Sequence, residues 1–354
     1  MSKIPTTKII ATLGPVSSSE TVIRKMILSG MDVARLNFSH GDTGAHQRRL
    51  DIVRKINLKY HRGIKILQDL EGNRIRVGKL KDGKPVELKK YQKIWLVKEE
   101  IIGSSKELCI DYNGSFMDIK SGSNIFIDDG NIKLQAKKSF RNKILAEVAA
   151  GGFLKEHKGI NIPEANLKFP RVTEKDRQDI EFGIKNKVDY VALSFVRDKY
   201  DCRVFRKILK DRHPDCLLVS KIESRPAIRN IDSIIEECDC ILIARGDMGI
   251  SVPIWEIPMI QKMIIRKCNQ RKRPVITATQ MLEHMVEFPQ PTRAEVTDVA
   301  NAILDGTDLV MLSAESAVGN YPVESVWMMN QIIRHTEKFL TLKRIYDRAL
   351  GKNY

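Results

Sequence analysis

The chain has 354 residues, of which 42% are hydrophobic and 29% charged, and this composition excludes intrinsic disorder, collagen and coiled coil. Its 60 basic and 44 acidic residues give a formal net charge of +16, but the excess is spread along the chain and forms no basic tail or stripe. A diffuse excess suits phosphorylated small molecules at least as well as nucleic acid. We therefore expect no nucleic-acid partner.

The sequence carries no mark of a membrane or secreted protein. No apolar run approaches the ~20 residues of a membrane-spanning helix, and Met1–Pro5 lacks the apolar core of a signal peptide. The six cysteines are scattered and form no metal-type pairs, which is typical of reduced thiols in a core. We expect a cytoplasmic protein without a membrane partner, a disulfide framework or a zinc site.

Eight short apolar runs of strand length recur along the chain, and each is followed by a helix-capable segment. Their Val, Ile and Leu residues are nearly continuous, which is typical of strands buried on both faces of a parallel sheet. Eight such units predict an α/β fold, a (β/α)8 TIM barrel. The runs are Lys8–Leu13, Asp32–Phe38, Ile64–Asp69, Asp189–Phe195, Cys216–Ile222, Asp239–Ala244, Pro274–Thr279 and Asp308–Ser313.

Residues 72–168 interrupt this rhythm after the third run. They show alternating strands, such as Asn124–Asp128 and Asn131–Ala136, separated by turn sequences that contain glycine. The pattern predicts a small antiparallel β-barrel inserted into a βα loop, where it lies over the barrel mouth as a lid. Beyond the insertion, Thr173 followed by Asp176 predicts a helix start through a capping box.

These patterns predict four parts of the chain. Residues 1–71 form the first part of the barrel, and residues 72–168 form the lid. Residues 169–340 complete the barrel, and residues 341–354 form a C-terminal helix or tail.

Active sites of barrel enzymes lie at the C-terminal ends of the strands, so the polar residues that close each run are candidates. A single polar residue at a strand end is explained equally well as an ordinary strand end that meets water. Six runs with polar ends, expected to converge on one mouth, indicate a functional site. These ends are Arg35-Leu36-Asn37-Phe38-Ser39, Asp69, Lys221-Ile222-Glu223, Arg245-Gly246-Asp247, Thr277-Ala278-Thr279-Gln280 and Ser313-Ala314-Glu315.

The residue types at these ends favour phosphoryl chemistry. Glu223 and Asp247 come from adjacent strands and supply hard carboxylate oxygens, which suit Mg²⁺ or Mn²⁺ rather than zinc. Lys221 lies two positions before Glu223 and therefore on the same side of the strand. Together with Arg35 and Arg76 it gives three fixed cations, a set suited to stabilising charge on a transferring phosphoryl group.

Two common nucleotide-binding patterns are missing or too weak. The chain has no GxxxxGK[ST] loop, which excludes a P-loop ATPase. Gly246-Asp247-Met248-Gly249 is too short a glycine pattern to indicate a dinucleotide site.

Seven segments resemble signatures of the pyruvate kinase family and occur in that family's order over nearly the whole chain. The predicted lid also falls where that family has its inserted B domain. The segments are Thr12-Leu13-Gly14-Pro15, Ala34-Arg35-Leu36-Asn37-Phe38-Ser39-His40-Gly41, His157-Lys158-Gly159-Ile160-Asn161-Ile162-Pro163, Ser220-Lys221-Ile222-Glu223, Ala244-Arg245-Gly246-Asp247-Met248-Gly249, Ala278-Thr279-Gln280-Met281-Leu282 and Pro291-Thr292-Arg293-Ala294-Glu295.

The resemblance implies glycolytic transfer of a phosphoryl group from phosphoenolpyruvate to ADP, giving pyruvate and ATP. It implies that Glu223 and Asp247 bind Mg²⁺ and that Lys221 stabilises the phosphoryl group and the enolate. Thr279 would lie on the face where enolpyruvate is protonated. The implied catalytic residues are Lys221, Thr279, Arg35 and Arg76, the two arginines gripping phosphate.

The resemblance also implies three groups of ligand contacts. Substrate would be held by Ala244, Arg245, Gly246, Asp247, Thr279 and Ser313, with the backbone of Ala244–Asp247 on its carboxylate. Nucleotide contacts would be Pro15, Asn37, His40 and Lys158, while Asp129 on the lid would swing toward the phosphates. A monovalent cation would be bound by Asn37, Ser39, Asp69 and Leu70.

The stretch Gln68–Arg76 departs from the family's potassium-activated form, which looks like Asp-Thr-Lys-Gly-Pro-Glu-Ile-Arg. Arg74 stands where that form has glutamate, and a fixed cation there can take over the electrostatic role of bound K⁺. We therefore expect activity without K⁺.

The chain stops shortly after the eighth barrel unit, so we expect the family's C-terminal effector-binding domain to be absent. Allosteric activation by sugar phosphates or nucleotides is then not expected. Loss of that domain removes one of the family's two subunit interfaces, which favours a homodimer formed through the barrel helices over a tetramer.

Two other functions remain open on the sequence alone. A lyase or aldolase acting on pyruvate-like enolates would use the same metal and Lys221, although it has less need of a nucleotide lid. A non-enzymatic relative would bind nucleotide or RNA through its positive charge. Against this second alternative, the expected catalytic set is intact and no aromatic-interleaved basic patch is visible in the sequence.

Overall fold

The computed structural model describes residues 6–165 and 167–349. Residues 1–5, examined above for a signal peptide, and residues 350–354, at the end of the expected tail, lie outside the described residues. Within the described ranges, no helix is both long enough and apolar enough to cross a membrane.

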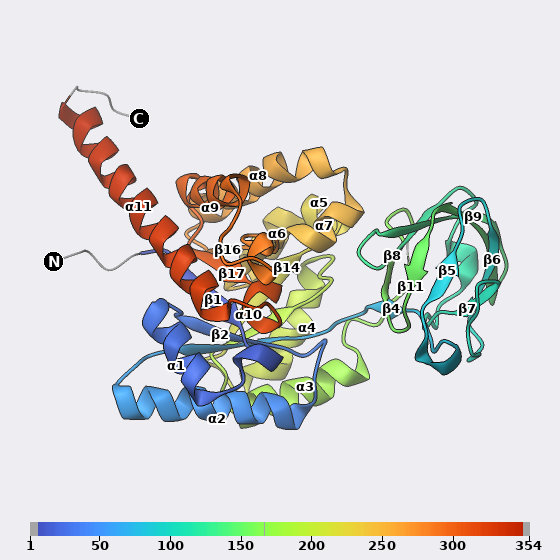
Figure 1. Ribbon diagram of the computed structural model, residues 1–354, viewed down its shortest axis with the longest axis horizontal. Coiled ribbons are helices and arrows are strands. Elements are labelled where there is room, and N and C mark those ends of the chain that lie inside the picture. The colour runs from blue at the N-terminus through green and yellow to red at the C-terminus, as the bar shows by residue number, and fades with distance from the viewer. Residues whose placement is uncertain (1–5, 166, 350–354) are drawn as a thin grey trace.

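Eight parallel strands close into a barrel in the spatial order β1-β17-β16-β15-β14-β13-β3-β2 (Figure 1). The prediction of a (β/α)8 barrel is confirmed, and each strand lies inside one of the eight predicted apolar runs. The strands are β1 (Lys8–Thr12), β2 (Val33–Asn37), β3 (Lys65–Asp69), β13 (Tyr190–Leu193), β14 (Leu217–Ile222), β15 (Cys240–Ala244), β16 (Val275–Ala278) and β17 (Leu309–Leu312).

Four of the predicted runs begin with an aspartate that precedes the strand itself. Each of these carboxylates accepts a hydrogen bond from a backbone N–H near the start of the neighbouring strand. The four bonds therefore satisfy backbone donors at the N-terminal rim of the barrel. They run from Ile9 to Asp32 (2.9 Å), from Ile66 to Asp189 (2.8 Å), from Leu218 to Asp239 (2.8 Å) and from Val275 to Asp308 (2.9 Å).

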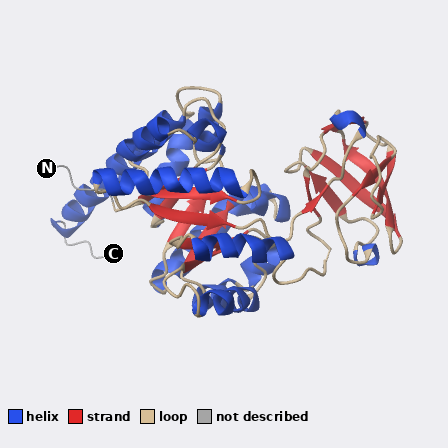
Figure 2. Cartoon of the chain, turned by 90° about the horizontal axis from the view of Figure 1, so that it is seen from below, coloured by secondary structure: helices blue, strands red, loops and turns tan. Residues whose placement is uncertain are grey.

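Helices cover the outside of the barrel (Figures 1 and 2). The predicted capping box is present at the start of α3, where Thr173 Oγ1 accepts from the Asp176 N–H at 2.9 Å. The helices are α1 (Glu20–Ser29), α2 (Thr43–Tyr60), α3 (Glu174–Lys185), α4 (Lys199–Lys210), α5 (Arg225–Arg229), α6 (Ile231–Glu237), α7 (Arg245–Ser251), α8 (Ile257–Gln270), α9 (Arg293–Asp305), α10 (Ala314–Ala317) and α11 (Pro322–Ala349). Helix α11 is therefore continuous across residue 340, where the tail was expected to begin. Short 3-10 helices are η1 (Pro15–Ser17), η2 (Lys81–Gly83), η3 (Phe116–Asp118), η4 (Ile254–Glu256) and η5 (Glu283–Val286).

The lid lies between β3 and α3 in the chain, as predicted for the insertion. Its main sheet has the order β4-β12-β8-β9-β10-β6-β7, and an antiparallel bridge between Val77 and Ile110 joins its two edges. The strands are β4 (Ile75–Arg76), β6 (Lys93–Val97), β7 (Glu107–Cys109), β8 (Asn124–Ile127), β9 (Ile132–Ser139), β10 (Lys143–Ala150) and β12 (Gly159–Asn161), with a separate pair β5 (Val86–Leu88) and β11 (Gly152–Leu154).

The lid has a hydrophobic core of its own. Buried side chains such as Ile125, Leu134 and Ile144 pack together inside it, separately from the core between the barrel and its helices. The lid stands beside the barrel and is joined to it by two chain segments (Figure 2). Because the two hydrophobic cores are separate, we call these two segments the hinge region of the lid.

Candidate active site

Lys221 occupies the centre of the barrel mouth. Its Nζ lies 2.9 Å from Glu223 Oε1 and 3.3 Å from Asp69 Oδ1, and it donates a hydrogen bond to Ser194 Oγ at 2.7 Å. Burial opposes a charge on this amine, but the carboxylates of Asp69 and Glu223 outweigh burial and raise the pKa of Lys221 above its ordinary value of 10.5. The mouth therefore holds a permanent cation.

Arg35 stands beside this lysine, held by the same acid. Its Nε donates to Asp69 Oδ2 at 2.8 Å, and its Nη1 donates to Thr12 Oγ1 at 2.8 Å. Burial alone would raise the pKa of Asp69, but Lys221 and Arg35 hold that pKa below 3.8. Ser194 Oγ, which accepts from Lys221, donates in turn to the Leu70 carbonyl at 2.7 Å. One network thus joins the C-terminal ends of five barrel strands.

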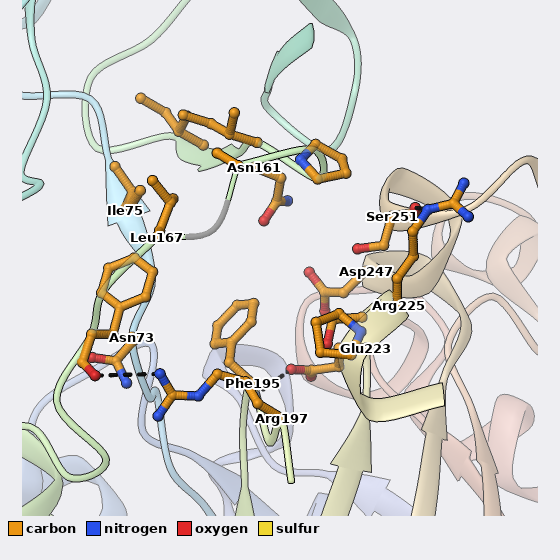
Figure 3. Close-up of a pocket in the computed structure, with 17 residues that line it drawn as sticks. Asn73, Ile75, Asn161, Leu167, Phe195, Arg197, Glu223, Arg225, Asp247 and Ser251 are labelled. Carbon is orange, nitrogen blue, oxygen red and sulfur yellow. Dashed lines mark hydrogen bonds between the residues drawn. The ribbon is translucent and has the colours of Figure 1, made fainter. Parts of the chain in front are cut away.

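Glu223 and Asp247 form one wall of a cavity between the barrel and the lid hinge, which we call the hinge cavity (Figure 3). Glu223 Oε2 accepts the Phe195 N–H at 2.7 Å, while the buried Oε1 has an ion pair with Lys221 but no hydrogen bond. Burial and the nearby Asp247 raise the pKa of Glu223. Two hard carboxylates with an oxygen free of hydrogen bonds fit a divalent cation such as Mg²⁺ or Mn²⁺.

In the described part of the chain, no third His, Cys, Asp or Glu joins these two carboxylates in a metal-ligating group. Two carboxylates suit Mg²⁺, which commonly keeps several coordination positions for water or substrate oxygens.

Thr279 and the start of α7 form the next part of the mouth. Thr279 has φ +68°, and its Oγ1 accepts the Gly246 N–H at 2.8 Å while donating to the Ala278 carbonyl at 2.6 Å. The Arg245 side chain points to the Thr279 carbonyl (2.7 Å) and to Asp298 (2.7 Å). Arg245 therefore fixes the loop after β16 with its guanidinium.

Ser313 lies at the end of β17 and is held by a buried acid. The Ser313 N–H donates to Glu315 Oε2 at 2.7 Å, and the Leu282 N–H donates to Glu315 Oε1 at 3.1 Å. Glu315 has no exposed surface, and its burial raises its pKa. This carboxyl group links the loops after β16 and β17.

A second hollow lies between the loop after β2 and the lid, and we call it the barrel–lid cleft. It brings together Ser39, His40, Arg76 and Lys158 from the sequence prediction. Burial, aided by Arg76 and Arg74, lowers the pKa of His40 below its ordinary value of 6.5, which favours the neutral imidazole. The full lining is Ser39, His40, Glu71, Arg74, Arg76, Asp128, Asp129, His157, Lys158 and Gly159.

Arg74 reaches from the lid hinge to both sides of the site. Its Nη2 lies 3.1 Å from Asp129 on the β8–β9 turn and 3.9 Å from Asp247 at the barrel mouth. Arg74 therefore places a fixed positive charge between the lid and the carboxylate pair.

The remaining predicted residues lie at or beyond the edge of these hollows. Pro15 is exposed in η1, whereas Ser313 is partly buried, and neither residue lines one of the two hollows. Asn37 Oδ1 accepts the Ser39 N–H at 3.1 Å. The Leu70 side chain is fully buried, so only its carbonyl, which accepts from Ser194, faces the polar network.

Sequence reasoning missed two polar residues of the site. Ser194 is the last residue but one of the fourth apolar run, one of the two runs whose ends were not examined. Applying the strand-end rule there would have found it. Glu71 pairs with Arg76 and lies 3.6 Å from Lys175. Since Glu71 lies two positions beyond a strand end, no local pattern indicated it.

Comparison with known proteins agrees with this architecture. The family model described as the pyruvate kinase barrel domain matches residues 4–326. The chain is 44% identical over 350 residues to a pyruvate kinase of Clostridium perfringens, covering 98% of this chain and 73% of that protein. It is 46% identical over 333 residues to a pyruvate kinase of Thermococcus litoralis, covering 94% and 70%. A pyruvate kinase of Clostridium acetobutylicum is 42% identical over 348 residues, covering 98% and 72%. The chain therefore belongs to the pyruvate kinase family.

Proposed function

We propose that this chain catalyses transfer of the phosphoryl group of phosphoenolpyruvate to ADP, giving pyruvate and ATP. The observation that carries the proposal is the position of Lys221, whose Nζ lies between Asp69, Ser194 and Glu223 at the barrel mouth. A buried cation beside a carboxylate pair suits the stabilisation of negative charge that shifts from a phosphoryl group to an enolate.

Glu223 and Asp247 would hold the divalent cation, Mg²⁺ or Mn²⁺. When bound, that ion supplies positive charge to phosphoryl oxygens. Lys221 adds a second positive charge from the protein, and Arg35 and Arg76 orient phosphate. Positioning and charge neutralisation account for most of the catalysis that such a transfer requires.

The other proposed roles are those that the family resemblance implies. Thr279 would orient the group that protonates enolpyruvate, because an enolate product must gain a proton to become a ketone. The backbone from Ala244 through Gly246 to Asp247 would bind the substrate carboxylate. Adenine nucleotide would occupy the barrel–lid cleft beside His40 and Lys158, with Pro15 and Asn37 at its edge. Asn37, Ser39, Asp69 and Leu70 would form the monovalent-cation site, whose charge Arg74 would replace.

A coupled assay of pyruvate formation from phosphoenolpyruvate, ADP and Mg²⁺ tests this function. We expect turnover in the wild type and a loss of roughly 100-fold or more in Lys221→Met, since this substitution removes charge stabilisation of the transition state. Circular dichroism must show that the variant is folded, because Asp69 and Glu223 lose a buried partner. Lys221→Gln, which retains a hydrogen-bonding group, is the second variant. A folded wild type without turnover contradicts the proposal.

Three properties expected from the sequence stay predictions. They are a cytoplasmic location, a homodimer and a hyperbolic response to phosphoenolpyruvate without sugar-phosphate activation. Sedimentation velocity and substrate saturation curves with and without a sugar phosphate test the last two.

A further inference from the structure

Arg76 is held by two partners in the barrel–lid cleft. Its Nε donates to Glu71 Oε1 at 2.9 Å, its Nη2 contacts the same oxygen, and its Nη1 donates to the His157 carbonyl at 3.0 Å. These three contacts leave one N–H on each Nη atom free for a ligand. The guanidinium is therefore fixed in orientation before any phosphate arrives.

Glu71 is itself anchored on the barrel side. Its Oε2 lies 3.6 Å from Lys175 Nζ, and Lys175 donates to the Phe38 carbonyl at 2.8 Å. The Glu71 side chain is only 14% exposed. Glu71 thus ties Arg76, which belongs to the first strand of the lid, to α3 and to the loop after β2.

The same arrangement occurs two residues earlier in the chain. Asp69 holds Arg35 through the Nε atom of that arginine at 2.8 Å, just as Glu71 holds Arg76. Two acids on one segment, Asp69 and Glu71, therefore orient the two arginines expected to grip phosphate. Among the described residues, Glu71 is the one whose carboxylate contacts the Arg76 guanidinium, while Asp111 accepts the backbone N–H of Arg76.

We propose that Glu71 is a positioning residue for phosphate binding, acting through Arg76; this rests on the proposed function. Two effects of Glu71 on an incoming phosphate oppose each other. Its negative charge repels the phosphate, whereas its hold on Arg76 removes the entropy cost of ordering a long side chain during binding. We expect the second effect to be the larger one, because Glu71 holds Arg76 through two of its nitrogen atoms and is itself close to Lys175.

The two opposing effects predict opposite changes in the KM for phosphoenolpyruvate when Glu71 is replaced. In Glu71→Ala, we expect the KM for phosphoenolpyruvate to rise about tenfold while kcat changes by less than about threefold, because orientation of a charged hydrogen-bond donor is lost. The KM of Glu71→Gln should lie between those of the wild type and of Glu71→Ala, because the amide oxygen of glutamine still accepts an arginine N–H. A KM that is unchanged or lower in both variants overturns the proposal, because charge alone predicts tighter binding.

A matched control variant and a double variant test whether Glu71 acts through Arg76. Glu147→Gln removes a glutamate that pairs with Lys137 at 3.1 Å elsewhere on the lid, and it should leave the KM unchanged. In an Arg76→Gln background, Glu71→Ala should change the KM by less than about twofold, since interacting residues are not additive. A full further increase in that background overturns the proposal.

Calorimetric titration with phosphoenolpyruvate, in the presence of Mg²⁺ and without ADP, distinguishes failure of the proposed role of Glu71 from failure of the proposed function. If the wild type binds but does not turn over, the proposed function fails, and the affinity of Glu71→Gln still decides the role of Glu71. If the wild type neither binds nor turns over, both proposals fail. Thermal unfolding of each variant checks folding, and Glu71→Gln decides the matter if Glu71→Ala unfolds.

Discussion

At the residue scale, the protein keeps charges buried by giving each one several partners. Lys221 is almost enclosed, yet it contacts two carboxylates and a hydroxyl group. Arg35 and Asp69 share the same network. Removing one member of such a group leaves an uncompensated buried charge. The resulting loss of folding free energy is larger than the contribution of the original ion pair. The site is therefore a set of mutually dependent residues.

Arg74 provides a test of the monovalent-cation requirement. We expect the wild type to be equally active in Na⁺, in tetramethylammonium and in K⁺ buffers, because Arg74 already supplies a positive charge beside Asp129 and Asp247. In Arg74→Glu, turnover without K⁺ should fall roughly tenfold or more, and added K⁺ should restore part of it. Strong activation of the wild type by K⁺, measured by the coupled assay, would refute this expectation.

His46 predicts a pH dependence of stability. Burial, followed by the charge of Arg49, lowers the pKa of His46 from 6.5 to about 4, and its ring stacks on Phe38. Between these two pH values the unfolded chain binds a proton that the folded chain does not. The free energy of unfolding should therefore fall as the pH drops below 6.5 and level off above it.

Urea unfolding at pH 7.5, 6.5 and 5.5 measures this effect. His46→Phe keeps an aromatic ring against Phe38 and removes the titrating group, so its stability should decline less on acidification. An identical decline in the wild type and in the variant would assign the pH dependence to other groups.

At the element scale, one hydrogen-bond arrangement occurs four times around the barrel. An aspartate before β2, β13, β15 and β17 accepts a backbone N–H from β1, β3, β14 and β16 respectively. The strands are thus pinned in pairs at the N-terminal rim. The chemistry-bearing residues lie at the other rim, so stability and function occupy opposite ends of the barrel.

Substitution at this rim should affect stability without affecting the site. Asp189→Ala leaves the Ile66 N–H without its carboxylate partner, and we expect the free energy of unfolding to fall by about 1–2 kcal/mol. Asp189→Asn keeps an acceptor oxygen and should cost less. The urea midpoint measures both, and a large change in kcat with unchanged stability would contradict this division of roles.

At the scale of the whole molecule, two separate cores share one chain. The barrel and the lid each bury their own apolar side chains, and two hinge segments connect them. The first segment is fixed where the Gly72 N–H donates to Asp176 Oδ1 at 3.1 Å. We therefore propose that residues 72–168 move as a unit over the barrel mouth and exclude water during transfer.

Hydrogen exchange tests this motion. Adding phosphoenolpyruvate and MgADP should slow exchange in the described parts of the hinge segments, residues 70–76, 161–165 and 167–169, and in the loop after β2. Exchange in the core strands of the lid, β9 and β10, should stay the same because a rigid unit keeps its internal hydrogen bonds. Equal slowing of exchange throughout the lid would show that ligand binding stabilises the interior of the lid, and would contradict its motion as a rigid unit.

The sequence by itself determined the eight barrel strands, the inserted β unit and most of the polar strand ends, because these features depend on local patterns. A buried strand needs a continuous apolar run, and a barrel fixes which end of that run carries the chemistry. The prediction of the strands is accordingly confirmed to within a residue or two at each end. The family resemblance rests on the same short segments.

Only the tertiary structure decided which side chains pair. Ser194 joins Lys221 because barrel closure brings neighbouring strand ends together, and Glu71 meets both Arg76 and Lys175 because the hinge folds back against α3. The direction of the Arg245 side chain, toward the Thr279 carbonyl and Asp298, was equally invisible in the sequence. Contacts between residues far apart in the chain depend on how the elements pack, and no local pattern encodes that geometry.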